Sequence, residues 1–120
     1  MLFAETGHLC VATLHANNAN QAIERIMHLP PASSHAKRRF DLSQNIRAIF
    51  AQQLVPNIDG NGRVAAIEIL LNTPLIKALI QRNEIGLLKE AMVKGQDQGM
   101  QKCVYWYGQL AGIIRSLILK

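Results

Sequence analysis

A chain of 120 residues, 49% hydrophobic and 18% charged, is long enough for one small domain with a buried core and too apolar for a disordered tail. Its net charge of +5 permits an acidic partner without identifying one. Two distant cysteines, Cys10 and Cys103, exclude a disulfide framework or a zinc ribbon, so we expect a reduced, cytoplasmic setting. The acidic Glu5 and the absence of a basic segment before it argue against a secretory signal.

The first predicted element is a strand between two histidines. His8 and His15 enclose the apolar run 9–14, which has no helical period and is typical of a strand buried on both faces of a parallel sheet. An asparagine in the segment 16–18 is a good N-cap for a helix over 20–28. The apolar positions of this helix lie on one face: Ala22, Ile23, Ile26 and Met27.

A second, longer helix is expected after the proline pair at 30–31. Ser33 or Ser34 can cap it, and its apolar positions advance by three and four as far as about residue 53. These positions are Leu42, Ile46, Ile49 or Phe50, and Ala51 or Leu54.

A hairpin is predicted next. Residues 54–56 indicate a short strand for which Pro56 marks an edge or an end. The segment 59–62 reads Asp-Gly-Asn-Gly, a strong hairpin signal with too few side-chain oxygens for calcium. The returning strand covers 63–71, where Glu68 is the one charge after Arg63.

Two further helices follow the hairpin. Thr73 and Pro74 begin the first as N-cap and first helical residue, and the second covers about 84–94 and ends at Gly95. The residues expected to be buried are Leu75, Ile76, Leu79 and Ile80 in the first helix, and Ile85, Leu88 and Met92 in the second.

Residues 102–120 change in character. The segment 105–107 holds three aromatic residues, and 110–119 is apolar except for Gly112, Arg115 and Ser116. A transmembrane span needs about 20 apolar residues, so none is expected here. A peripheral amphipathic helix, an oligomer contact and a tail outside the fold all remain open.

The two histidines are the main candidates for chemistry. Ligands of open α/β sheets bind beyond the carboxyl ends of strands, and His15 lies at such an end, beside a helix start whose dipole favours anions. A neutral imidazole there can donate to a phosphate oxygen. The alternative is a histidine that only ends a strand and bonds to a neighbouring backbone group, and the spacing by itself favours this alternative. The sequence contains no glycine-rich phosphate loop, no acidic strand end for magnesium and no metal-ligand spacing, so by itself it cannot complete a nucleotide site.

The segment 4–17, AETGHLCVATLHAN, resembles the histidine box of the secretion and pilus ATPases, in particular the PilT/PilU-type twitching motility (type IV pilus) ATPases. The likeness returns strongly at 53–56 and 62–76, and spans about residues 4–101 in all. Where the PilT branch carries a helix reading A-I-R-N-L-I-R-E, residues 75–82 read LIKALIQR, which favours the PilU branch. After residue 101 the family continues T-F-D-Q, but this chain does not, and a frameshift or spliced boundary would explain the difference.

The resemblance implies an α/β fold: the carboxy-terminal portion of a RecA-like P-loop ATPase core, with a β-hairpin and a C-terminal helical region. In that interpretation residues 1–72 belong to the ATPase core, 73–101 to the helical region and 102–120 to a divergent tail. The family's Walker A and Walker B segments precede the matching region, so the chain alone is expected to be inactive. ATP and Mg²⁺ would be the cofactors of the complete protein.

The resemblance also implies roles and partners. His8 and His15 would be catalytic, near the nucleotide phosphates, and Thr6, Gly7 and His15 would contact the cofactor. The function implied is the carboxy-terminal part of a motor that couples ATP hydrolysis to pilus retraction or twitching. The chain would form a homo-hexamer or associate with a paralogous motor, in the cytoplasm, at the inner-membrane pilus platform protein.

Two alternatives belong to other functional classes. A non-catalytic fragment could dock on an intact motor ring. A nucleic-acid-binding role would depend on Lys37-Arg38-Arg39, although a solvated helix face explains such a short basic run more often, and we expect no nucleic-acid partner.

Overall fold

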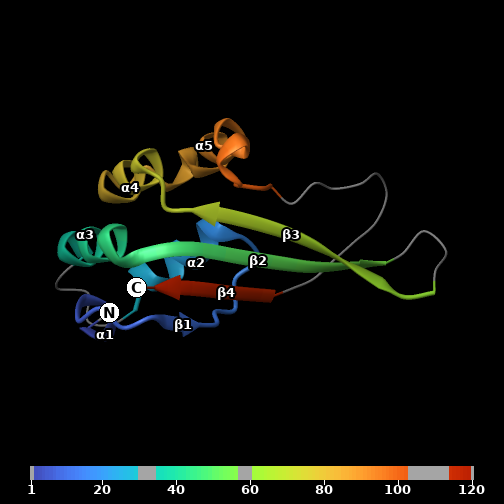
Figure 1. Cartoon of the computed structure of the whole chain (residues 1–120), viewed down its shortest axis with the longest axis horizontal. Helices are drawn as coiled ribbons and strands as arrows, with labels where there is room; N and C mark the ends of the chain where they lie inside the picture. Colours follow the sequence, from blue (N-terminus) through green and yellow to red (C-terminus); the bar gives the residue numbers. More distant parts are fainter. Residues whose placement is uncertain (1, 30–34, 57–60, 103–113, 120) are drawn as a thin grey trace.

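Two long antiparallel strands form the centre of the molecule in the computed structural model, which describes residues 2–29, 35–56, 61–102 and 114–119. Strands β2 (Ile46–Pro56) and β3 (Arg63–Leu71) pair continuously from Ala48 opposite Leu71 to Pro56 opposite Arg63. The predicted hairpin and its returning strand are therefore confirmed. Figure 1 shows the hairpin extending beyond the helices along the long axis of the molecule.

Helix α3 (His35–Asn45) runs directly into β2, so the prediction of one helix to about residue 53 was wrong beyond Asn45. The predicted core positions Leu42, Ile46 and Ile49 are nevertheless buried. Strand β2 pairs with β3 on one edge and with β4 on the other, which satisfies its backbone N–H and C=O groups on both sides. Residues 46–53 therefore form a strand because of these partners, although their local periodicity indicates a helix.

The sheet has the order β1-β4-β2-β3, and each of these pairings is antiparallel. Strand β4 (Ile114–Leu119) lies between β1 (Cys10–Ala12) and β2. Residues 114–119 therefore form a strand and not the amphipathic helix that their composition allowed. The aromatic segment 105–107 lies outside the described residues, as do the serines at 33–34 that were predicted to cap the second helix.

The first predicted strand exists but differs from expectation. It is three residues long, lies at an edge of the sheet and pairs antiparallel, whereas a doubly buried strand of a parallel sheet was predicted. Leu9 and Val11 are 69% and 63% exposed. An apolar run indicates which side chains favour burial, but it does not show what covers them. Among the described elements of this chain, none covers both faces of β1.

Helix α2 (Ala19–Met27) begins as predicted, with Asn18 as its N-cap. Helix α4 (Pro74–Gln81) has the predicted Thr73 cap, whose Oγ1 accepts from the N–H of Ile76, and proline in its first turn. A short helix α1 (Leu2–Glu5) was not predicted.

The predicted helix over 84–94 is divided into a 3-10 turn, η2 (Ile85–Leu87), and helix α5 (Leu88–Lys94), which ends at the predicted Gly95 and is followed by a second 3-10 turn, η3 (Gln96–Gln98). Most of the residues predicted for this part of the core are buried. Leu75 is the exception at 49% exposed, because it lies on the solvent side of the first turn of α4.

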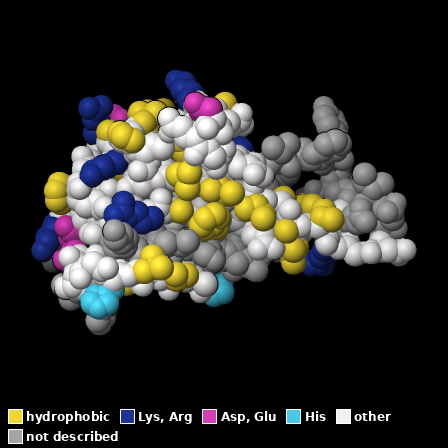
Figure 2. Space-filling view, in the orientation of Figure 1, with side chains coloured by type: hydrophobic (Ala, Val, Ile, Leu, Met, Phe, Trp, Pro, Cys, Tyr) yellow, Lys and Arg dark blue, Asp and Glu magenta, His cyan; other side chains and the backbone are white. Residues whose placement is uncertain are grey.

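The core lies between the helices and one face of the sheet (Figure 1). Its largest fully buried side chains are Ile23, Leu42, Ile46, Leu70, Ile76, Ile80, Leu88 and Met92. At the outer edge of the sheet β3 carries Val64 and Ile67, which are 51% and 39% exposed, and hydrophobic side chains gather over the part of the surface that β3 crosses (Figure 2).

Candidate functional site

The turn before β1 positions His8. Gly7 lies in the turn that follows helix α1. Its N–H donates to the carbonyl of Ala4 at 3.1 Å, and its φ of +85° lies in the left-handed region that favours glycine. The Oγ1 of Thr6 lies 2.9 Å from Nδ1 of His8. Thr6, Gly7 and His8 therefore form one exposed turn in which the threonine hydroxyl orients the imidazole.

His15 lies beyond the other end of β1, so the structure does not place the two histidines in one turn. It begins a segment that we name the His15 loop, residues 15–18, which leads into α2. The neighbouring Ala16 is 3% exposed, and its N–H donates to the carbonyl of Leu14 at 3.0 Å. A buried anchor next to an exposed imidazole holds the ring at the surface, where it can meet a ligand.

Hydrogen bonds at the start of α2 fix the His15 loop. The Oδ1 of Asn18 accepts from the N–H of Gln21 at 2.9 Å, and the Oε1 of Gln21 accepts from the N–H of Asn17 at 3.0 Å. This reciprocal arrangement resembles a capping box, because each side chain satisfies a backbone N–H of the other segment.

Two side chains of the hairpin also reach this loop, and they were not among the predicted site residues. The Oε1 of Glu68, on β3, accepts from the N–H of Ala19 at 2.7 Å, and the Nε2 of Gln53, on β2, donates to the carbonyl of Asn17 at 3.3 Å. One signal in the sequence pointed to Glu68, namely that it is the one charge in the apolar segment 64–71.

Glu68 changes what the helix start can do. Glu68 is 7% exposed, and its carboxylate lies at the positive end of the α2 dipole, where a negative group is stabilised. An anionic ligand at the same place would be repelled by this carboxylate. Glu68 therefore already interacts with the helix dipole that we expected to favour an anionic ligand. The His15 imidazole remains a group that is able to donate to a phosphate oxygen at this end of β1.

No cluster of three or more His, Cys, Asp or Glu side chains among the described residues could hold a metal ion. The residues around β1 offer a hydroxyl and imidazoles, which suit a phosphate oxygen better than Mg²⁺, a cation that prefers carboxylates and water. These residues therefore fit the phosphates of a nucleotide, and they do not fit its metal ion.

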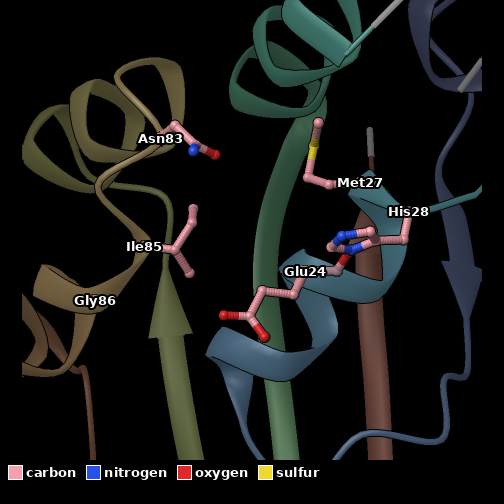
Figure 3. Close-up of a pocket in the computed structure, with 6 residues that line it drawn as sticks. All are labelled: Glu24, Met27, His28, Asn83, Ile85 and Gly86. Carbon is pink, nitrogen blue, oxygen red and sulfur yellow. The ribbon is translucent and has the colours of Figure 1, made fainter. Parts of the chain in front are cut away.

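A pocket of about 350 Å³ lies between α2 and the turn that follows α4 (Figure 3). Glu24, Met27 and His28 line it from α2 and its C-cap, facing Asn83, Ile85 and Gly86. Its two walls are connected by Asn20, whose Nδ2 donates to the carbonyl of Ile85 at 3.0 Å. None of the predicted site residues lines this pocket.

One residue of the basic triplet Lys37-Arg38-Arg39, namely Arg38, has a structural role. The guanidinium of Arg38 donates through one nitrogen to the carbonyls of Met27, at 3.1 Å, and Leu29, at the C-terminal end of α2. Cations are favourable at the negative end of a helix dipole. This contact favours a structural explanation of the triplet over a nucleic-acid surface.

Comparison with known proteins confirms the resemblance to the secretion and pilus ATPases and agrees with this fold. The model of the family described as type II/IV secretion system protein matches residues 2–109. The chain therefore belongs to the type II/IV secretion system protein family. The structure is a mixed α/β fragment consistent with part of the ATPase core of that family.

Relatives of this chain include two type IV pilus ATPases and a twitching motility protein. The chain is 62% identical over 99 residues to the type IV pilus ATPase PilU of Pseudomonas aeruginosa and 40% identical over 98 residues to the pilus retraction ATPase PilT of the same organism. A twitching motility protein of Neisseria gonorrhoeae is 41% identical over 98 residues. The greater identity to PilU than to PilT confirms the prediction made from residues 75–82.

These matches cover 82% of this chain but 26% of PilU, 28% of PilT and 26% of the gonococcal protein. The chain thus spans about a quarter of the length of these relatives. Among solved structures, the pilus retraction motor PilT with bound ADP superposes with a TM-score of 0.59 and 31% identity, over 74% of this chain and 28% of that one. In the part of the chain that the structure describes, no helix is long and apolar enough to cross a membrane.

Proposed function

We propose that this chain is the carboxy-terminal part of a PilU-like type IV pilus motor ATPase, which couples ATP hydrolysis to pilus retraction or twitching. The observation that carries the proposal is the 62% identity to PilU over 99 residues, which is 82% of this chain. In the complete motor, residues 1–72 would complete the ATPase core and 73–101 would form the helical region. Residues 102–120 would be a tail that is divergent in sequence, although its residues 114–119 pair within the sheet as β4.

In this proposal His15 donates from its ring to a phosphate oxygen of ATP, held at the surface by the buried Ala16 beside it. His8 approaches the same phosphates from the other end of β1, and Thr6 and Gly7 shape its turn. ATP supplies the free energy of hydrolysis, and the groups that hold Mg²⁺ belong to other segments of the motor. The motor would assemble as a hexamer or with a paralogous motor, in the cytoplasm, at the platform protein of the inner membrane.

The test uses a complete motor that carries this segment. The 99 matched residues of Pseudomonas aeruginosa PilU are replaced by those of this chain, and ATP hydrolysis is measured for the exchanged motor and for its His15→Ala variant. We expect His15→Ala to lower kcat by about 10²-fold, as expected for loss of a group that stabilises transferred phosphate. The control is His28→Ala, a histidine at the end of α2 whose Nδ1 bonds within its own helix.

Two outcomes would contradict the proposal. Equal hydrolysis by the His15→Ala and unchanged motors would exclude the role given to His15. An exchanged motor that assembles but hydrolyses no ATP would favour the alternative, a non-catalytic segment that docks on an intact motor ring.

A further inference from the structure

We infer that Glu68 and Gln53 are positioning residues, which hold the His15 loop against the β2–β3 hairpin and so couple the orientation of His15 to that hairpin. The inference rests on the proposed function in one respect, namely that His15 faces the nucleotide.

The two side chains belong to one face of the hairpin. Gln53 is opposite Ala66 and Glu68 is opposite Ala51, so the alternation along each strand places Gln53 and Glu68 on the same side. They reach neighbouring points of the backbone: the carbonyl of Asn17 in the His15 loop and the N–H of Ala19, the first residue of α2. One hairpin therefore contacts the end of the His15 loop through both of its strands.

The burial of Glu68 argues against a role that is limited to filling the core, because burying a carboxylate costs desolvation free energy. It lies beside Leu70, which is fully buried, and opposite Ala51, which is 5% exposed. An apolar side chain would satisfy such surroundings without desolvating a carboxylate. Among the described residues, what the carboxylate gains is the 2.7 Å hydrogen bond from Ala19, so its evident effect is to fix the place where the loop becomes α2.

The loop does not need Glu68 to form a helix start, because Asn18 and Gln21 already cap α2. The bonds from the hairpin instead determine where the capped loop lies relative to β2 and β3. Any displacement of the hairpin therefore moves the segment that carries His15, and a ligand on His15 acts on the hairpin in return.

The first experiment measures amide hydrogen exchange in the full chain. Glu68→Leu keeps the volume and removes the acceptor, whereas Glu68→Gln keeps an acceptor oxygen. We expect exchange at residues 16–19 to rise about tenfold in Glu68→Leu, with the amides of α4 and α5 unchanged and with most of the protection restored in Glu68→Gln. Exchange that rises equally in all elements, or that stays unchanged, would overturn the inference.

A second pair of variants covers the case in which Glu68→Leu does not fold. Gln53→Leu removes the bond to Asn17, and Gln52→Leu makes the same change on the opposite face of β2. Faster exchange at residues 16–19 in Gln53→Leu than in Gln52→Leu supports the inference. Equal exchange in the two variants contradicts it.

The second experiment separates positioning from mere stability and uses the exchanged motor described above. If Glu68 acts through His15, Glu68→Leu lowers kcat with little change in KM, and the double variant with His15→Ala hydrolyses ATP no more slowly than His15→Ala alone. Independent, additive losses would overturn the inference. A His15→Ala motor of full activity would refute the proposed function, while the exchange data would still decide whether the hairpin holds the loop.

Discussion

Asn72 donates through Nδ2 to the carbonyl of Ile46 at 2.8 Å, and so ties the residue after β3 to the first residue of β2. The same nitrogen donates to the carbonyl of Ser43 at 2.9 Å, and the backbone N–H of Asn72 donates to Arg47 at 3.0 Å. These bonds satisfy backbone groups where α3 gives way to a strand. The bonds of Asn72 lie at the junction where the chain changes from helix α3 to strand β2, although the helical spacing of apolar residues continues in the sequence.

Replacing Asn72 by leucine is expected to lower the free energy of unfolding by about 1–3 kcal/mol, because two part-buried carbonyls lose their donor. Urea unfolding followed by circular dichroism measures this change. Gln96→Leu, an exposed change in η3, serves as the control and should alter stability by less than about 0.5 kcal/mol. Equal midpoints for the two variants would mean that the junction does not depend on Asn72.

The cap of α4 gives a second prediction. Thr73→Ala removes the oxygen that accepts from the N–H of Ile76 and should lower stability by about 1 kcal/mol. Thr73→Ser keeps the hydroxyl and should retain most of that stability. Thermal unfolding of the two variants compares them directly, and a serine variant as unstable as the alanine variant would exclude the capping bond as the cause.

Asn83 ends α4 in a left-handed conformation, with φ of 62°. Its N–H donates to the carbonyl of Ile80 and that of Glu84 donates to Leu79, the two bonds of a Schellman motif. Asn83→Gly should therefore be neutral or stabilising by up to about 1 kcal/mol, whereas Asn83→Val should destabilise by more than about 1 kcal/mol. Denaturant midpoints measure both, and a valine variant as stable as the unchanged chain would contradict this assignment.

The exposure of β1 can be tested by comparing a substitution in this strand with a substitution in the core. Val11→Ala should change the stability of this chain by less than about 0.5 kcal/mol, since the side chain is 63% exposed. Leu70→Ala, at a fully buried site on β3, should lower stability by about 2–5 kcal/mol. Chemical denaturation of both variants provides the comparison, and a large loss in Val11→Ala would show that β1 is buried in solution.

Signals that depend on neighbouring residues predicted local structure well. Asn18 and Thr73 cap the helices they were expected to cap, because a side-chain oxygen needs to reach an N–H only two or three residues away. The glycine-rich segment and Pro56 predicted the hairpin for a similar reason. The histidine box and the segments 53–56 and 62–76, which are also local motifs, together predicted the family.

The sequence by itself therefore determined the family, the starts of α2 and α4, the hairpin and most of the apolar core. Each of these depends on local chemistry or on the burial of apolar side chains. Tertiary structure alone decided that residues 46–53 form a strand, because its hydrogen-bonding partners lie on β3 and β4. It likewise decided that β1 is an exposed edge and that Glu68 meets Ala19, 49 residues away in the chain. Contacts between segments so distant in sequence leave no periodic trace, because they depend on how the whole chain packs.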